Sequence, residues 1–141
     1  MLVAEIIRGK GDTVHTISPD ITLTEACMAL QQHRVGALVV CDGPKVVGIL
    51  SERDVVRVVA DRGVEGLNAP VREHMTSQVV FAHPSETVAT LMERMTDRRI
   101  RHLPVMRDGN LAGVISIGDV VKSHIEETVR EAESLRNYIA G

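Results

Sequence analysis

Aromatic residues are almost missing from this chain of 141 residues, which has one Phe, one Tyr and no Trp. Since 44% of the residues are nevertheless hydrophobic, the chain can bury a core, and that core must be aliphatic. A chain of this length fits one ordinary domain, which buries roughly two-thirds of the surface that it exposes when unfolded.

Long apolar runs, clustered cysteines and a strong charge of one sign are missing as well. No run approaches the roughly 18 apolar residues that cross a bilayer, and the first residues lack the basic and then apolar pattern of a signal peptide. Cys27 and Cys41 are too few for a disulfide framework, and the six histidines show no metal-ligand spacing. A net charge of −3 provides no electrostatic footprint for nucleic acid. We therefore expect a cytoplasmic protein without a metal, nucleic acid or membrane partner.

The chain does contain an internal repeat. The stretch Gly48–Asp54, which reads GILSERD, recurs 65 residues later as Gly113–Asp119, which reads GVISIGD. From Val14 to Arg57, eleven of 44 ungapped positions match the residue 65 positions further on, whereas chance would give about three in a chain rich in Val and Leu. The match indicates a duplicated unit.

Each copy shows hydrophobic patterns and turn residues that predict strand, helix, strand, strand and helix. In the first copy, Thr22 and Glu25 form a capping-box pattern at a helix start. The fold class is therefore α/β (α+β), with two β-α-β-β-α units related by a pseudo-twofold axis, because neither small sheet can bury its apolar face alone. We place the units at residues 1–67 and 68–141, with a linker at 63–70. The expected strands are 14–17, 37–41, 46–50, 79–82, 102–106 and 111–115, and the expected helices are 23–33, 52–61, 88–98 and 118–139.

The last helix extends well beyond its counterpart in the first copy. Its apolar positions are spaced four and three residues apart over about two and a half heptads, a seam that is short for an independent coiled coil. Two interpretations carry equal weight: the helix packs back on its own unit, or it contacts a second copy or another partner. The seam consists of Val121, Ile125, Thr128, Ala132, Leu135 and Ile139.

The repeated Ser-x-x-Asp pattern has a structural and a functional interpretation. A serine three residues before an acid is itself a helix capping box, so these side chains could serve only to satisfy backbone amides. In the functional interpretation, Gly48 and Gly113 allow a ligand or backbone to approach the strand closely, and the helix start attracts a phosphate. The aspartate would then accept hydrogen bonds from ribose hydroxyls. Nothing in the pattern provides a nucleophile with its base.

The duplicated unit, closed in each copy by Gly-h-h-Ser-x-x-Asp (h, hydrophobic), resembles the CBS domain, which is named after cystathionine β-synthase. The run Arg101-His102-Leu103-Pro104-Val105 is similar to one common in the same family. The resemblance covers nearly the whole chain and leaves only its two ends outside.

The resemblance implies that paired CBS units bind adenosine-containing ligands in clefts between the units and that two such pairs form a flat dimer. The implied ligands are AMP, ADP, ATP and NAD(H), with S-adenosylmethionine ranked below them. Asp54 and Asp119 would hold ribose hydroxyls, and Ser51 and Ser116 would meet phosphate or ribose. Backbone groups of 16–17 and 81–82 would meet adenine, with 37–39 and 102–104 beside the base. The implied site residues are Thr16, Ile17, Ala37, Leu38, Val39, Ser51, Glu52, Arg53, Asp54, Phe81, Ala82, Arg101, His102, Leu103, Pro104, Ser116, Ile117, Gly118 and Asp119.

The two copies differ at these positions, so we expect non-equivalent sites. Arg53 in the first copy could pair with a phosphate, where the second copy has Gly118. The second copy instead has Arg101 and His102, which could reach phosphates. The leading hypothesis is a non-catalytic regulatory module that senses energy or redox state through an effector protein or its own homodimer. The alternatives are a structural dimerisation scaffold without a physiological nucleotide and, ranked last, an enzyme.

Overall fold

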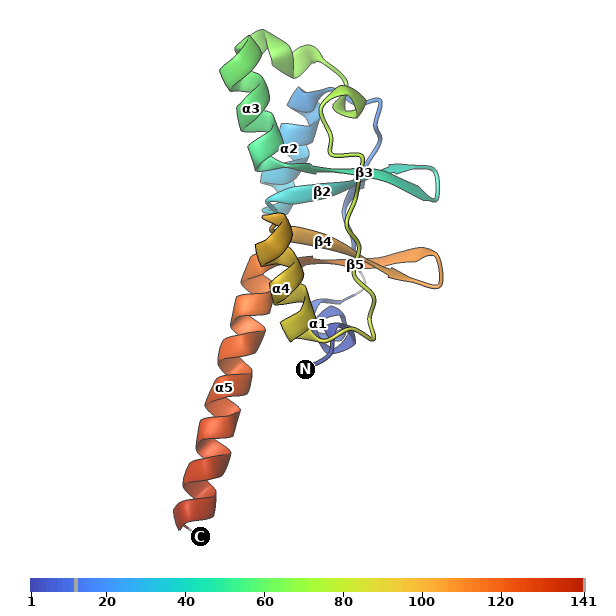
Figure 1. Ribbon diagram of the computed structural model, residues 1–141. Helices are drawn as coiled ribbons and strands as arrows, with labels where there is room; N and C mark the ends of the chain where they lie inside the picture. The colour runs from blue at the N-terminus through green and yellow to red at the C-terminus, as the bar shows by residue number, and fades with distance from the viewer. Residues whose placement is uncertain (12, 141) are drawn as a thin grey trace. The chain divides into compact units, whose positions relative to one another are not determined.

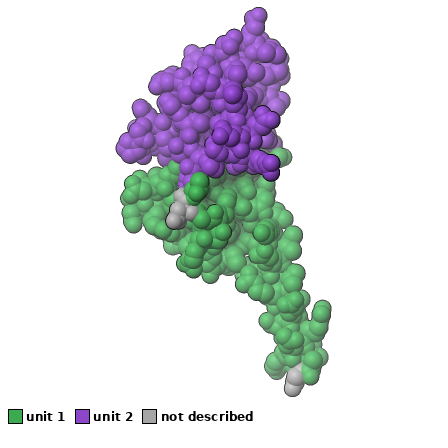
Figure 2. All heavy atoms as spheres, turned by 180° about the vertical axis from the view of Figure 1, so that it is seen from behind, with its two compact units in different colours: residues 1–13, 81–141 green, residues 14–80 purple. Residues whose placement is uncertain are grey.

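The computed structural model describes residues 1–11 and 13–140, which form two compact units. Residues 14–80 form the first-repeat unit, which is unit 2 in Figure 2. Residues 1–13 and 81–141 form the second-repeat unit, which is unit 1 in Figure 2. Packing therefore groups the first residues of the chain with the second repeat. The division at 67/68 stays a prediction about where the repeats begin and end.

The first-repeat unit contains a three-stranded sheet and two helices. Its strand order is β1-β2-β3, with β1 parallel to β2 and β2 antiparallel to β3. The expected helix over 23–33 is confirmed, and its start is capped by Thr22 Oγ1, which accepts a hydrogen bond from the amide of Glu25. In chain order the elements are β1 (Thr16–Ile17), α2 (Leu23–His33), β2 (Ala37–Asp42), β3 (Lys45–Ser51), α3 (Glu52–Arg62) and the 3-10 helices η1 (Val64–Asn68) and η2 (Val71–Glu73).

The second-repeat unit repeats this arrangement with a two-stranded antiparallel sheet of β4 and β5 (Figure 1). Both antiparallel pairs carry a register shift at matching positions, Val40/Cys41 and Val105/Met106. The mixed α/β class predicted from the sequence is thus confirmed. The elements are α1 (Val3–Lys10), α4 (Val88–Arg98), β4 (His102–Arg107), β5 (Asn110–Ser116) and α5 (Ile117–Ala140).

The strand expected over 79–82 is wrong in extent. Only Ala82 forms a bridge, to Val105, where the first-repeat unit has the strand β1. The Ala82 amide donates to Pro104 O at 2.9 Å, and the Ala82 carbonyl accepts from Met106 N at 2.9 Å. Pro104 stands where the first repeat has Val39, and proline has no amide to donate to a neighbouring strand. The pairing therefore does not extend back from Ala82 to Phe81, the counterpart of Thr16 in β1.

Two segments, which we call the docking segments, pack on the units. Residues 1–11, which precede the first repeat, pack on the second-repeat unit, and residues 71–76, which precede the second repeat, pack on the first-repeat unit. Val3 N donates to Glu86 O at 2.9 Å in the second-repeat unit, and Val71 N donates to Ile21 O at 2.8 Å in the first-repeat unit. Glu86 and Ile21 are themselves 65 residues apart, so the two docking segments are structural counterparts. Val3 and Val71 are both fully buried, which extends the aliphatic core of each unit at about 25 cal/mol per Å² of apolar surface.

The helix α5 continues well past the rest of its unit (Figure 1). Only Val120 and Ser123 are buried along it, and every residue from Thr128 to Ala140 is exposed. Of the two interpretations of the seam, packing on its own unit is therefore wrong for the second half of the helix. Among residues 1–11 and 13–140, no helix combines the length and the apolar character that a membrane span requires.

Candidate functional site

The same capping box closes β3 in the first repeat and β5 in the second. Ser51 N and Ser51 Oγ donate to Asp54 Oδ2 at 2.9 and 3.1 Å, and the Asp54 amide donates back to Ser51 Oγ at 3.4 Å. The matching distances for Ser116 and Asp119 are 2.9, 3.0 and 3.2 Å. The structural interpretation of the pattern is thus confirmed. Because both bonds to each carboxylate end on Oδ2, neither cap uses the second carboxylate oxygen, Oδ1.

The first amide of each helix is taken by a neighbouring loop. Glu52 N donates to Gly36 O at 2.9 Å, and Ile117 N donates to Arg101 O at 2.8 Å. A helix start leaves four amides without partners inside the helix, and the cap and the loop together take three of them. Within the described part of the chain, the amide left over is that of Arg53 in α3 and of Gly118 in α5.

The two carboxylates differ in burial and in the cation beside them. Asp54 is 8% exposed, and its nearest cation is Arg57, whose Nη1 lies 3.7 Å from Oδ1 on a side chain that is 68% exposed. Asp119 is half-buried, and Lys10 Nζ lies 2.7 Å from its Oδ2. Burial alone would raise the pKa of Asp119, but the hydrogen bonds and charge of Lys10 and the hydrogen bonds from Ser116 outweigh it and hold that pKa below its usual value.

Gly48 and Gly113 make room for the docking segments. A Cβ on Gly48 would lie 2.5 Å from Met75 Sδ and 3.0 Å from the carbonyl oxygen of Thr76. A Cβ on Gly113 would lie 2.5 Å from Ile7 Cδ1. The expectation of a close approach by backbone is confirmed at Gly48, where the Thr76 carbonyl lies against the strand. At Gly113 the approaching group is the side chain of Ile7.

The predicted site residues of the first repeat lie together on β1, β2, β3 and the start of α3. Thr16 lies opposite Val39 across the parallel pair, and Ala37 lies opposite Ser51 across the antiparallel pair. Strand pairing thus brings the predicted base-binding residues next to the capping box. The exposed members are Thr16, Glu52 and Arg53, and the buried or half-buried ones are Ile17, Ala37, Leu38, Val39, Ser51 and Asp54.

The second repeat gathers its predicted residues in the same way. His102 lies opposite Ser116, and Pro104 lies opposite Val114. Among the exposed members, Phe81 is 40% exposed although it is the one phenylalanine of the chain. The other exposed members are Arg101, Ile117 and Gly118, and the buried or half-buried ones are Ala82, His102, Leu103, Pro104, Ser116 and Asp119.

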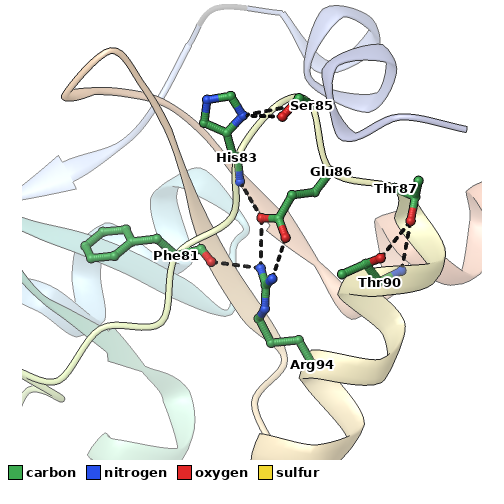
Figure 3. A network of polar contacts seen from close by, with 7 residues as sticks. All are labelled: Phe81, His83, Ser85, Glu86, Thr87, Thr90 and Arg94. Carbon is green, nitrogen blue, oxygen red and sulfur yellow. Dashed lines mark hydrogen bonds and ion pairs between the residues drawn. The ribbon is translucent and has the colours of Figure 1, made fainter.

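A polar network that has no counterpart in the first repeat supports the Phe81 end of this unit (Figure 3). Arg94 forms an ion pair with Glu86 and donates to Phe81 O at 3.0 Å, while the His83 amide donates to Glu86 at 2.8 Å. The hydrogen bond from Arg94 is the main cause that lowers the pKa of Glu86. A carbonyl has two lone pairs, so Phe81 O retains one for another donor.

Sequence reasoning missed Lys10 and the Arg94–Glu86 pair. Both lie outside the pattern that repeats every 65 residues, because the first repeat has Ile21 and Ala29 where the second has Glu86 and Arg94. A second search could have found the docking segments, since Val3 and Glu5 recur as Val71 and Glu73 at a spacing of 68. No sequence signal connects Lys10 to Asp119.

Comparisons with known proteins agree with this geometry. The sequence profile of the CBS domain matches residues 3–61 and 71–126. The chain is similar to the CBS-domain containing protein ATU1752 from Agrobacterium tumefaciens, with a TM-score of 0.86 and 44% identity over 88% of this chain and 99% of that one.

Two other similar structures contain adenosine compounds. The CBS domain protein PAE2072 from Pyrobaculum aerophilum, complexed with AMP, has a TM-score of 0.75 and 28% identity over 84% of this chain and 89% of that one. The CBS domain pair of protein MJ0100, in complex with 5′-methylthioadenosine and S-adenosylmethionine, has a TM-score of 0.79 and 25% identity over 90% of this chain and 98% of that one. With its duplicated fold, its two capped Ser-x-x-Asp turns and this profile match, the chain belongs to the CBS domain family.

Proposed function

We propose that the protein is a non-catalytic regulatory module that binds adenosine-containing ligands at its two Ser-x-x-Asp turns. AMP, ADP, ATP and NAD(H) are the leading ligands, and S-adenosylmethionine ranks below them. Asp54 and Asp119 accept hydrogen bonds from the ribose hydroxyls, and the amides of Arg53 and Gly118 face the phosphates. The binding state is passed to an effector protein or to the protein's own dimer.

The observation that carries this proposal is the arrangement of each aspartate in its cap. Three hydrogen bonds fix the carboxylate through Oδ2 and the main chain, and none of them uses Oδ1. A fixed acceptor with one oxygen outside the cap suits the adjacent hydroxyls of a ribose, because little side-chain entropy is lost when the sugar binds. The presence of AMP or S-adenosylmethionine in similar CBS structures supports the same ligand class.

The surroundings of the two turns suit the rest of such a ligand in different ways. Arg53 is exposed and forms no ion pair among the described residues, so its guanidinium is free to meet a phosphate. In the second repeat, the exposed ring of Phe81 presents a face on which a base could stack. The two sites therefore differ in ligand preference.

A second candidate, a dimerisation scaffold without a nucleotide, is favoured by the exposed apolar side of α5. Ile125, Leu135 and Ile139 are 56%, 62% and 77% exposed. A stripe of exposed apolar side chains along a helix is typical of a surface that contacts a partner. Both candidates include a dimer in which α5 pairs with a second copy through the seam. They differ in whether the protein binds a nucleotide.

The deciding experiment is a thermal-shift panel of AMP, ADP, ATP, NAD(H) and S-adenosylmethionine on the wild type, Asp54→Asn and Asp119→Asn. The amide oxygen of asparagine can still accept the hydrogen bonds of the cap. These variants should therefore lose the negative charge and retain the fold. Thr22→Ala and Thr87→Ala are the matched controls, since they remove caps of α2 and α4 outside the motif.

A ligand present at 100 times its dissociation constant should stabilise the wild type by about 2.7 kcal/mol, or roughly 10 °C for a chain of this size. Each Asp→Asn change should reduce the shift, and the threonine controls should retain it. If no compound shifts the wild type, the scaffold is favoured. If the shifts survive both substitutions, binding occurs elsewhere.

A further inference from the structure

Lys10 connects the end of α1 to the second-repeat motif. Its Nζ donates to Val114 O at 2.8 Å and to Asp119 Oδ2 at 2.7 Å. The lysine side chain is 41% exposed and that of Asp119 is 23% exposed. An ammonium group has three N–H donors, so two are used here and a third remains on an exposed side chain.

The lysine is held in place by the helix that carries it. Ala4 N donates to Pro84 O at 3.0 Å, and Ile7 is buried against Gly113. The helix then ends directly after Lys10, at Gly11, whose φ of 87° is left-handed and favours glycine. Lys10 is therefore a fixed part of the motif's surroundings.

In the first-repeat unit, a backbone amide instead of a lysine donates to the carbonyl that matches Val114 O. Ile49 stands where the second repeat has Val114, and Ile49 O accepts from the Thr76 amide at 2.9 Å. No lysine among the described residues reaches Asp54, whose one ion-pair partner is Arg57 on the same helix, at 3.7 Å and largely exposed. A fixed cation is thus a feature of the second-repeat motif alone.

The charge balance at the two turns differs accordingly. Asp119 and Lys10 together are close to neutral. Asp54 has no cation within hydrogen-bonding distance among the described residues, and its partner Arg57, 3.7 Å away and 68% exposed, compensates it only weakly. Arg53 is exposed beside the first turn but forms no ion pair with Asp54. A negative group on the ligand is repelled by the carboxylate of Asp54 and attracted by the exposed ammonium of Lys10. When a ribose is held by Asp119, its C5′ substituent lies within one sugar ring of Lys10.

We propose that Lys10 sets the ligand preference of the second-repeat site, so that this site selects adenosine ligands with an anionic group at C5′ over neutral or cationic ones. This inference rests on the proposed function and assigns a role to a residue outside the family motif. It predicts that AMP binds there more tightly than adenosine, and that S-adenosylmethionine, whose sulfonium is positive, binds more weakly than AMP.

The test uses isothermal titration calorimetry of AMP, adenosine and S-adenosylmethionine, with Asp54→Asn as the background that weakens the other site. Lys10→Gln removes the charge, Lys10→Arg keeps it, and Arg8→Gln removes an exposed charge from the same helix as a matched control. The ratio of the adenosine and AMP dissociation constants should fall about tenfold in Lys10→Gln and stay unchanged in Arg8→Gln. Lys10→Arg should retain most of the ratio.

Each other outcome overturns the proposal in a recognisable way. If Lys10→Gln changes the affinity for all three compounds equally, in either direction, Lys10 blocks or supports the site without selecting ligands. If Asp54→Asn abolishes binding that the wild type shows, the second-repeat turn is not a site, although the proposed function survives at the first. If the wild type binds none of the three compounds and no other nucleotide of the panel, the proposed function fails and this inference fails with it.

Discussion

The two repeats build the same capped turn and surround it differently. In the first-repeat unit, the docking segment contributes backbone from Thr76, and the aspartate has a largely exposed arginine 3.7 Å away. In the second-repeat unit, the docking segment is a helix that contributes a lysine. Duplication thus preserved the turn that fixes the carboxylate, while the segment that covers the strand beside it was free to change the local charge.

The largest expected effect concerns the helices after the two turns, because α3 ends at Arg62 whereas α5 continues to Ala140. We propose that α5 pairs with a second copy, so ending the chain after Thr128, which removes the exposed half of the seam, should convert that dimer into a monomer in sedimentation velocity. Leu135→Gln should weaken the dimer, while Glu131→Gln, on the polar face of α5 opposite the seam, should leave it unchanged. A dimer that persists in the truncated protein would show that α5 does not carry the contact.

The next effect separates the two strand glycines. Gly48→Ala should destabilise the protein by about 1–3 kcal/mol, as overpacking commonly does, because its Cβ would press on backbone of Thr76 as well as on Met75. Gly113→Ala should cost less, since the group in the way is the end of the flexible Ile7 side chain. Urea unfolding of both variants measures the difference. Equal costs would contradict the distinction drawn between the two docking segments.

A smaller effect is expected where the two turns are alike. Ser51→Ala and Ser116→Ala each remove a helix cap and should cost about 1 kcal/mol of unfolding free energy. The two costs should agree because the cap distances nearly agree. Thermal unfolding without ligand is the measurement. A cost confined to one serine would mean that the caps differ in the protein.

The smallest effect is on acid stability. The pKa of Asp119 is lowered in the folded protein, so its contribution to stability is present above the unfolded pKa of about 3.9 and is lost as pH falls through the lower, folded pKa. Lys10→Gln should raise the pKa of Asp119 and reduce this contribution. Carbon-13 NMR titration of the Asp119 carboxyl measures the shift, with Arg8→Gln as the control. An unchanged pKa in Lys10→Gln would show that the lysine does not hold the carboxylate in solution.

Local patterns predicted much of the fold. The helices over 23–33 and 88–98 were predicted with their observed bounds because a threonine caps each start and apolar residues recur at helical spacing. The helix α1 was missed because it is short and begins after Leu2, which has no capping oxygen to mark the start. The strand over 79–82 was overestimated because the effect of Pro104 acts across the sheet, on a neighbour far along the chain.

The site was predictable only where it is local. The Ser51–Asp54 and Ser116–Asp119 caps connect residues three apart, so the sequence displays them directly. Lys10 reaches Asp119 across 109 residues, and the reason for Gly48 and Gly113 lies in segments that dock from elsewhere in the chain. Such contacts depend on tertiary packing, which no periodicity or spacing records.

The most direct test of the central claim, that two like turns are unlike adenosine sites, is a crystal structure of the wild-type protein with AMP. We predict ribose hydroxyls within hydrogen-bonding distance of Asp54 or Asp119, and a phosphate near Lys10 wherever the second turn is occupied. AMP bound with its ribose away from both carboxylates, or bound identically at both turns with Lys10 turned aside, would contradict the account.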